Sequence, residues 1–261
     1  MVASAALPDP EQEMNSLRNA IVEIDDKALD LPDATSTGEV SASPPVANSQ
    51  PRRVRKIRSV LAQTPTGQQA LAIIDRYNVS IGFVAGSKGY FSPGENKITL
   101  GRDYDIPTAA LVLVHEANHT KAHNDGSGVN TYDEALQLSR EQYILGMITE
   151  EATADLLRLQ TFEELNRLPR DQQIYDYSTL GVSNWDAYRR GRQQGIDALL
   201  ALNPRASPDE LASAGAQGGL QAMIAEFYTG NVITSTTGES YLTFYGKYWD
   251  AVHKKPTGSI A

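Results

Sequence analysis

The segment His115-Glu-Ala-Asn-His119 contains the residue types of a hydrolytic metal centre. Histidines four positions apart lie one turn apart on the same face of a helix, so both imidazoles can bind one metal ion. Glu116 is rotated by about 100° from His115 and can reach a water molecule bound to that metal. A carboxylate in this place can act as the general base of metal-assisted hydrolysis. We therefore predict His115 and His119 as metal ligands and Glu116 as the catalytic base.

Two histidines do not complete a catalytic zinc site, which typically has three protein ligands and a water molecule. His123 continues the stripe, but its Cα would lie about 12 Å from that of His115, too far for one ion. Asp125 lies six residues after His119, where metzincin-type enzymes carry their third ligand. Those enzymes need glycine at the position of Ala122, so Asp125 remains only an alternative.

A second acidic segment, Glu150-Glu-Ala-Thr-Ala-Asp155, follows downstream. Together with the first motif it resembles the gluzincin pattern of thermolysin-like metallopeptidases, over about residues 79–160. The resemblance implies one Zn²⁺ per chain, Glu151 as its third ligand and Asp155 as the residue that orients a zinc-bound histidine. Glu150 is the alternative ligand, and exposed charges on a helix surface are the simpler interpretation of both glutamates. The residues do not specify a subfamily.

Peptide hydrolysis also requires a donor for the developing oxyanion. Thermolysin-like enzymes use a tyrosine or histidine from their C-terminal part, which implies His253 or Tyr245 here, with Tyr241 and Tyr248 also available. Residues 241, 244, 245, 248 and 252 form a helical stripe, for which core packing is the favoured interpretation.

The elements that must position these residues predict an α+β fold, zincin-like, with a small, mostly antiparallel N-terminal sheet and a predominantly helical C-terminal half. Asp105 can cap the helix that carries both histidines, and Gly126 can end it. Thr131 begins a capping box for the next helix, which could bend at Gly146. We predict strands at 79–84, 90–91 and 97–100, and helices at 66–77, 105–124, 131–148, 149–165, 184–202, 208–228 and 240–253. A short edge strand before the metal helix is typical of zincins and can pair with an extended substrate.

Two regions are distinguished by composition. Residues 1–51 contain a short amphipathic helix within 11–30 and a linker at 31–51 rich in Pro, Ser, Ala and Thr, which predicts disorder. Residues 52–261 form a single zincin-like metallopeptidase domain. Its basic run at 52–58 is interpreted as a solvated helix face.

Composition narrows the function classes further. The 261 residues carry a net charge of −9, which disfavours nucleic acid and anionic lipid as partners, and the chain has no cysteine for a disulfide or a thiolate metal site. The sequence has neither a run of about 18–20 apolar residues nor a usual signal peptide. We expect no membrane span, and a cytoplasmic protein or one exported by a signal-independent route.

The leading functional hypothesis is a zinc-dependent peptidase that acts on a peptide or protein. One alternative is a zincin-fold binding protein with little catalytic activity, although the intact Glu116 argues against it. Another is a regulatory or nucleic-acid-associated protein in which the basic run at 52–58 matters and the histidine motif is accidental.

Overall fold

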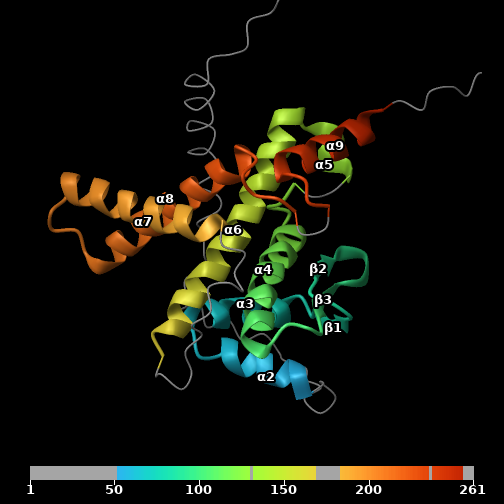
Figure 1. Cartoon of the computed structure of the whole chain (residues 1–261), viewed down its shortest axis with the longest axis horizontal. Helices are drawn as coiled ribbons and strands as arrows, with labels where there is room; N and C mark the ends of the chain where they lie inside the picture. Colours follow the sequence, from blue (N-terminus) through green and yellow to red (C-terminus); the bar gives the residue numbers. More distant parts are fainter. Residues whose placement is uncertain (1–51, 130–131, 169–182, 235–236, 255–261) are drawn as a thin grey trace, which may run out of the picture. The chain divides into compact units, whose positions relative to one another are not determined.

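A computed structural model gives the structure of the protein and describes residues 52–129, 132–168, 183–234 and 237–254. The helix and linker predicted within residues 1–51 lie outside these ranges. In Figure 1 a small sheet lies beside α4, and the helices that follow account for most of the described chain. The order is α2 (Arg52–Leu61), α3 (Pro65–Arg76), β1 (Ser80–Val84), β2 (Gly89–Ser92), a short 3-10 turn (Pro93–Glu95), β3 (Lys97–Gly101), α4 (Ile106–Asp125), α5 (Tyr132–Gln137), α6 (Arg140–Asn166), α7 (Ser183–Leu202), α8 (Pro208–Tyr228) and α9 (Tyr241–His253).

The sheet has the order β1-β3-β2, and its pairing is mixed. β2 pairs with β3 antiparallel, whereas β1 pairs with β3 parallel. The chain reverses direction between β1 and β2 and again before β3, so β3 runs in the direction of β1 and is inserted between the other two strands. The prediction of a mostly antiparallel sheet is wrong, because it did not foresee this insertion. β2 is left at one edge of the sheet.

The helix α4 begins and ends as its sequence predicts. The side chain of Asp105 accepts a hydrogen bond from the backbone N–H of Thr108 at 2.8 Å. At the other end Gly126 has φ +67°, a left-handed conformation that glycine adopts at little cost. Between these caps eleven of the twenty residues of α4 are buried, and the helix contacts α2, α3 and the sheet as well as α6.

The helices after α4 are divided differently from the prediction. Thr131 lies outside the described residues, and the helix after it, α5, already ends at Gln137. Ser139 starts the next helix, because its side chain accepts from the Gln142 N–H while Gln142 accepts from the Ser139 N–H. α6 then continues without a break through Gly146 and joins two helices that the sequence analysis separated.

Glycine at position 146 is required by packing. A Cβ added there would lie 2.3 Å from Cγ2 of Val129, in the segment after α4. Gly146 therefore allows this segment to approach α6 closely, and α6 is continuous through this position.

The C-terminal helices agree with the predicted ranges. α7 and α8 pack along each other, and α6 contacts both α8 and α9. Gly191 and Gly218 allow the α7–α8 contact, because a Cβ on either one would lie within 2.3 Å of the carbonyl oxygen of the other. No helix in the described part of the chain is both long enough and apolar enough to span a membrane.

Candidate metal centre

Helix α4 carries the segment His115–His119, and helix α6 carries the acidic segment Glu150–Asp155. The contact between the two helices brings these segments together. Within their contact, Glu116, Glu150, Glu151 and Asp155 are all buried. The interpretation of Glu150 and Glu151 as exposed surface charges is therefore wrong. Burial of an ionised carboxylate costs free energy unless the group is paired. The partners of these four carboxylates therefore indicate what the cluster does.

Three electron-donating atoms converge at the centre of the cluster. Nε2 of His119 lies 3.1 Å from Nε2 of His115. Oε2 of Glu151 lies 3.4 Å from Nε2 of His115 and 3.7 Å from Nε2 of His119. These three residues supply ligand atoms that all lie within 4.8 Å of one another and could hold one metal ion.

The other ring nitrogens are held by carboxylates. Nδ1 of His115 lies 3.0 Å from Oδ1 of Asp155, and Nδ1 of His119 lies 2.7 Å from Oε1 of Glu150. An ionised carboxylate only accepts, so each Nδ1 carries the proton and donates it. In a neutral imidazole this leaves Nε2 unprotonated, with its lone pair directed to the centre.

This donor set fits a metal ion such as zinc. Atoms about 2.0–2.1 Å from a tetrahedral zinc ion lie about 3.3 Å from one another. The three observed separations, 3.1, 3.4 and 3.7 Å, span this value. Two imidazole lone pairs and a carboxylate this close repel one another unless a proton or a metal cation lies between them. Nitrogen and oxygen ligands of this kind suit zinc among the divalent metals.

The electrostatics of the cluster favour positive charge at its centre. Burial lowers the pKa of His115, but the hydrogen bonds to Asp155 and Glu151 outweigh burial and raise this pKa to about 10. Burial raises the pKa of Asp155, but Arg158 and His115 outweigh it and lower the pKa to about 2. The same carboxylates that favour a proton on the imidazole would favour a metal cation in its place.

Glu116 lies beside the sheet. Its carboxylate faces the backbone N–H of Phe91, in the edge strand β2, and this N–H lowers the pKa of Glu116. A Cβ at Gly89 would lie 2.3 Å from Cγ1 of Val112 and 3.3 Å from Oε1 of Glu116, so glycine permits β2 to approach α4 here. Burial raises the pKa of Glu116, and the neighbouring histidines offset part of this increase. A carboxylate with a raised pKa is a better proton acceptor near neutral pH.

Asp155 has partners on two helices besides His115. Arg158, one turn along α6, places Nη2 2.9 Å from Oδ1 of Asp155. Asn184 of α7 donates from Nδ2 to Oδ2 of Asp155 at 2.6 Å. These contacts fix the carboxylate that holds His115.

Glu151 has a partner on α9. The hydroxyl of Tyr245 donates to Oε1 of Glu151 at 2.5 Å, and both side chains are buried. The role of Tyr245 as an oxyanion donor therefore stays a prediction, and in this structure its hydroxyl proton is engaged by Glu151.

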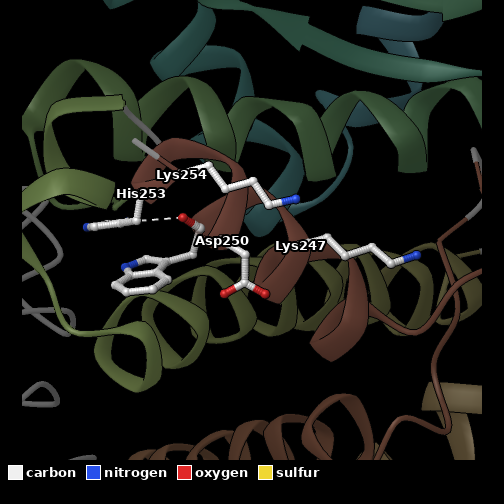
Figure 2. A pocket seen from close by; sticks show the side chains of 5 residues that line it. Lys247, Asp250, His253 and Lys254 are labelled. Carbon is white, nitrogen blue, oxygen red and sulfur yellow. Dashed lines mark hydrogen bonds between the residues drawn. The ribbon is translucent and has the colours of Figure 1, made fainter. Parts of the chain in front are cut away.

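His253 lies two turns beyond Tyr245 on α9. Its ring stacks on Trp249 with centroids 3.6 Å apart, and its Nδ1 lies 3.0 Å from the Trp249 carbonyl oxygen (Figure 2). It is exposed and lines a pocket of about 650 Å³ formed by α9 residues, none of which belongs to the histidine–carboxylate cluster. Eight residues of helix separate His253 from Tyr245 by about 12 Å, so the expectation for His253 is corrected.

The alternative third ligands lie elsewhere on α4. Asp125 accepts a hydrogen bond from the hydroxyl of Tyr77 and forms an ion pair with Lys121. The ring of His123 packs against Phe91 at a centroid distance of 5.9 Å. Neither residue belongs to the group that can hold a metal.

Sequence reasoning missed the roles of Glu150, Arg158 and Asn184 around the histidines. Sequence analysis gave Glu150 only as an alternative ligand or a surface charge. In the structure α6 runs beside α4, and the adjacent residues Glu150 and Glu151 both reach the histidines. Arg158 could have been found from its spacing, since residues three apart on a helix are neighbours. Asn184 lies on another helix, 29 residues from Asp155 in sequence, and no local pattern indicates it.

Comparison with known protein families gives one match. Its sequence model, described as "Putative metallopeptidase family (DUF6782)", matches residues 32–175, slightly more than half of the chain. No curated protein and no solved structure matches significantly. The matched segment includes both histidines and all four buried carboxylates of the cluster, and the chain belongs to this metallopeptidase family.

Proposed function

We propose that this protein is a zinc-dependent peptidase of gluzincin type, in which His115, His119 and Glu151 hold one zinc ion. The observation that carries the proposal is the convergence of three potential ligand atoms, with both histidine Nδ1 atoms already bound by carboxylates. The placement of Glu151 and Asp155 on a second helix, one turn apart, supports the gluzincin assignment.

A zinc ion held there would polarise a substrate carbonyl and lower the pKa of a bound water molecule to about 7. Glu116 takes the proton from the attacking water and delivers it to the leaving amine. The Phe91 N–H stabilises the ionised form of the Glu116 carboxylate, and burial raises its pKa, which makes it a better proton acceptor. Asp155 and Glu150 keep the two Nδ1 protons in place, so that the histidines remain neutral ligands.

The edge strand β2 offers a place for an extended peptide. Among the described residues, β2 pairs with β3 on one side and has no strand on the other. Its Phe91 N–H contacts the carboxylate of Glu116, so a peptide paired with the free edge would lie close to the base. We therefore propose a peptide or protein segment in extended conformation as the substrate.

The deciding experiment combines metal analysis with a peptidase assay. We expect the purified protein to contain about one zinc per chain and to cleave unstructured polypeptide chains, with activity lost on chelation and restored by zinc. His119→Ala should lose both zinc and activity, whereas His123→Ala, outside the cluster, should keep both. Stoichiometric zinc without cleavage of any polypeptide would instead favour the binding-protein alternative.

A further inference from the structure

We propose that Tyr245 selects which oxygen of Glu151 faces the metal position and thereby makes Glu151 a ligand through one oxygen only. The inference rests on the proposed metal site and concerns a positioning residue from outside the segment that the family model matches. It assigns α9 a role in the chemistry of a centre built mainly on α4 and α6.

The two oxygens of Glu151 have different surroundings. Oε1 accepts the hydroxyl proton of Tyr245 at 2.5 Å. Oε2 faces the imidazoles, 3.4 Å from Nε2 of His115 and 3.7 Å from Nε2 of His119. The hydrogen bond therefore occupies one oxygen and leaves the other directed to the centre.

The number of Glu151 oxygens that bind the metal determines how many coordination positions of the metal stay open. A carboxylate ligand can bind a metal through one oxygen or through both. A hydrolytic zinc site has three protein ligands and needs its remaining position for water or substrate. A second oxygen from Glu151 would compete for that position, and the hydrogen bond to Tyr245 opposes this by stabilising the charge on Oε1.

Tyr245 is held firmly enough to act in this way. Its ring packs edge-on against Tyr143 of α6, with centroids 6.5 Å apart, and only 6% of its surface is exposed. The Tyr245 hydroxyl is therefore confined to a narrow range of positions. As a buried polar group it needs a hydrogen-bond partner within the protein.

The orientation of α9 is fixed by contacts with the chain around the start of α6. Nε1 of Trp249 donates to the carbonyl oxygen of Leu138 at 3.1 Å, and Arg140 pairs with Asp250 at 3.0 Å. The Arg140 guanidinium lies over Gly246, where a Cβ would be 2.3 Å from Nη2. α9 is thus attached to the same helix that carries Glu151, and Tyr245 keeps its position relative to the carboxylate.

The test compares Tyr245→Phe with Tyr248→Phe, the same chemical change one turn along α9. Tyr248 is 41% exposed and stacks on Tyr143, so its variant controls for loss of a hydroxyl from this helix. Two quantities are measured: zinc affinity, by competition with a chromogenic chelator, and the visible absorption of the Co²⁺-loaded protein. Co²⁺ absorbs strongly with four ligands and weakly with five or six.

For Tyr245→Phe we expect zinc affinity to fall about 10–100-fold, as for other outer partners of metal ligands. The Co²⁺ absorption should also weaken, because the freed Oε1 adds a ligand. Tyr248→Phe should match the wild type in both measurements. Thermal unfolding of the metal-free proteins checks that both variants fold.

Two results would overturn the inference. One is a Tyr245→Phe variant with wild-type zinc affinity and Co²⁺ spectrum, as expected if the hydroxyl serves only the oxyanion or packing. The other is weakened affinity with an unchanged spectrum. Glu151→Ala separates the inference from the proposed function: if it binds zinc as tightly as the wild type, the metal site itself is wrongly assigned.

Discussion

Oε1 of Glu150 lies 2.7 Å from Nδ1 of His119, while the next residue, Glu151, directs its own carboxylate to the opposite nitrogen of the same ring. Two consecutive glutamates therefore act on one imidazole from both sides. The first fixes its tautomer, and the second would bind the same metal ion in the proposed site.

Removal of Glu150 should weaken the site without destroying it. Glu150→Ala leaves all three proposed ligands in place but removes the acceptor for the Nδ1 proton of His119. We expect a loss of about 10–100-fold in zinc affinity, similar to that for Asp155→Ala. Glu151→Ala, which removes a ligand, should lose far more. Competitive chelator titration gives this order.

The control for this series is Glu141→Ala, an exposed glutamate in the first turn of α6. It should bind zinc as the wild type does. Glu150→Gln keeps an oxygen acceptor and should recover much of the affinity that Glu150→Ala loses. If Glu150→Ala bound zinc normally, its contact with His119 would have only a structural role.

Glu116→Gln separates catalysis from metal binding. The amide keeps the shape of the side chain, but it cannot accept a proton at neutral pH. Zinc content and thermal stability should stay at wild-type values, while peptide hydrolysis falls below detection. A variant with even a tenth of the wild-type turnover would show that Glu116 is not the base.

The sequence was sufficient to predict those features whose determinants lie within a few residues of one another. Asp105 and Gly126 cap α4 through contacts within a few residues, and the helical period then places His115 and His119 on one face. The end of α5 could also have been predicted, since Ser139 and Gln142 have the spacing of a capping box, but the apolar positions continue across this break and concealed it.

The sequence was insufficient where partners are distant. Tyr245 reaches Glu151 across 94 positions of sequence. The tyrosine stripe on α9 predicted both core packing and a catalytic hydroxyl, and only the tertiary structure shows that Tyr245 is buried and also engaged with a carboxylate. The parallel pairing of β1 with β3 could not be predicted from the sequence either. It depends on the insertion of β3 between the other two strands and not on the composition of β1 or β3.

Glu164 links α6 to the start of α3 and should contribute to stability independently of the metal. Its carboxylate accepts from the backbone N–H of Thr66 at 3.0 Å and from the Thr66 hydroxyl at 2.7 Å. Glu164→Ala leaves these donors without that acceptor at a helix N-terminus. We expect the free energy of unfolding to fall by about 1–2 kcal/mol, measured by urea denaturation of the metal-free protein. Glu95→Ala, which removes only an exposed ion pair with Lys97, should change it by less than about 1 kcal/mol.

Zinc should stabilise the folded protein, because the proposed ligands come from two helices that separate on unfolding. His115 and His119 lie on α4 and Glu151 on α6, so the ion would link them only in the folded state. A ligand that binds only the folded state adds about 2.7 kcal/mol at a concentration 100 times its dissociation constant. The unfolding temperature should therefore rise with zinc concentration. His119→Ala should abolish this rise and His123→Ala should preserve it, since His123 packs on Phe91 outside the cluster. An equal zinc-dependent rise in both variants would mean that the ion binds elsewhere.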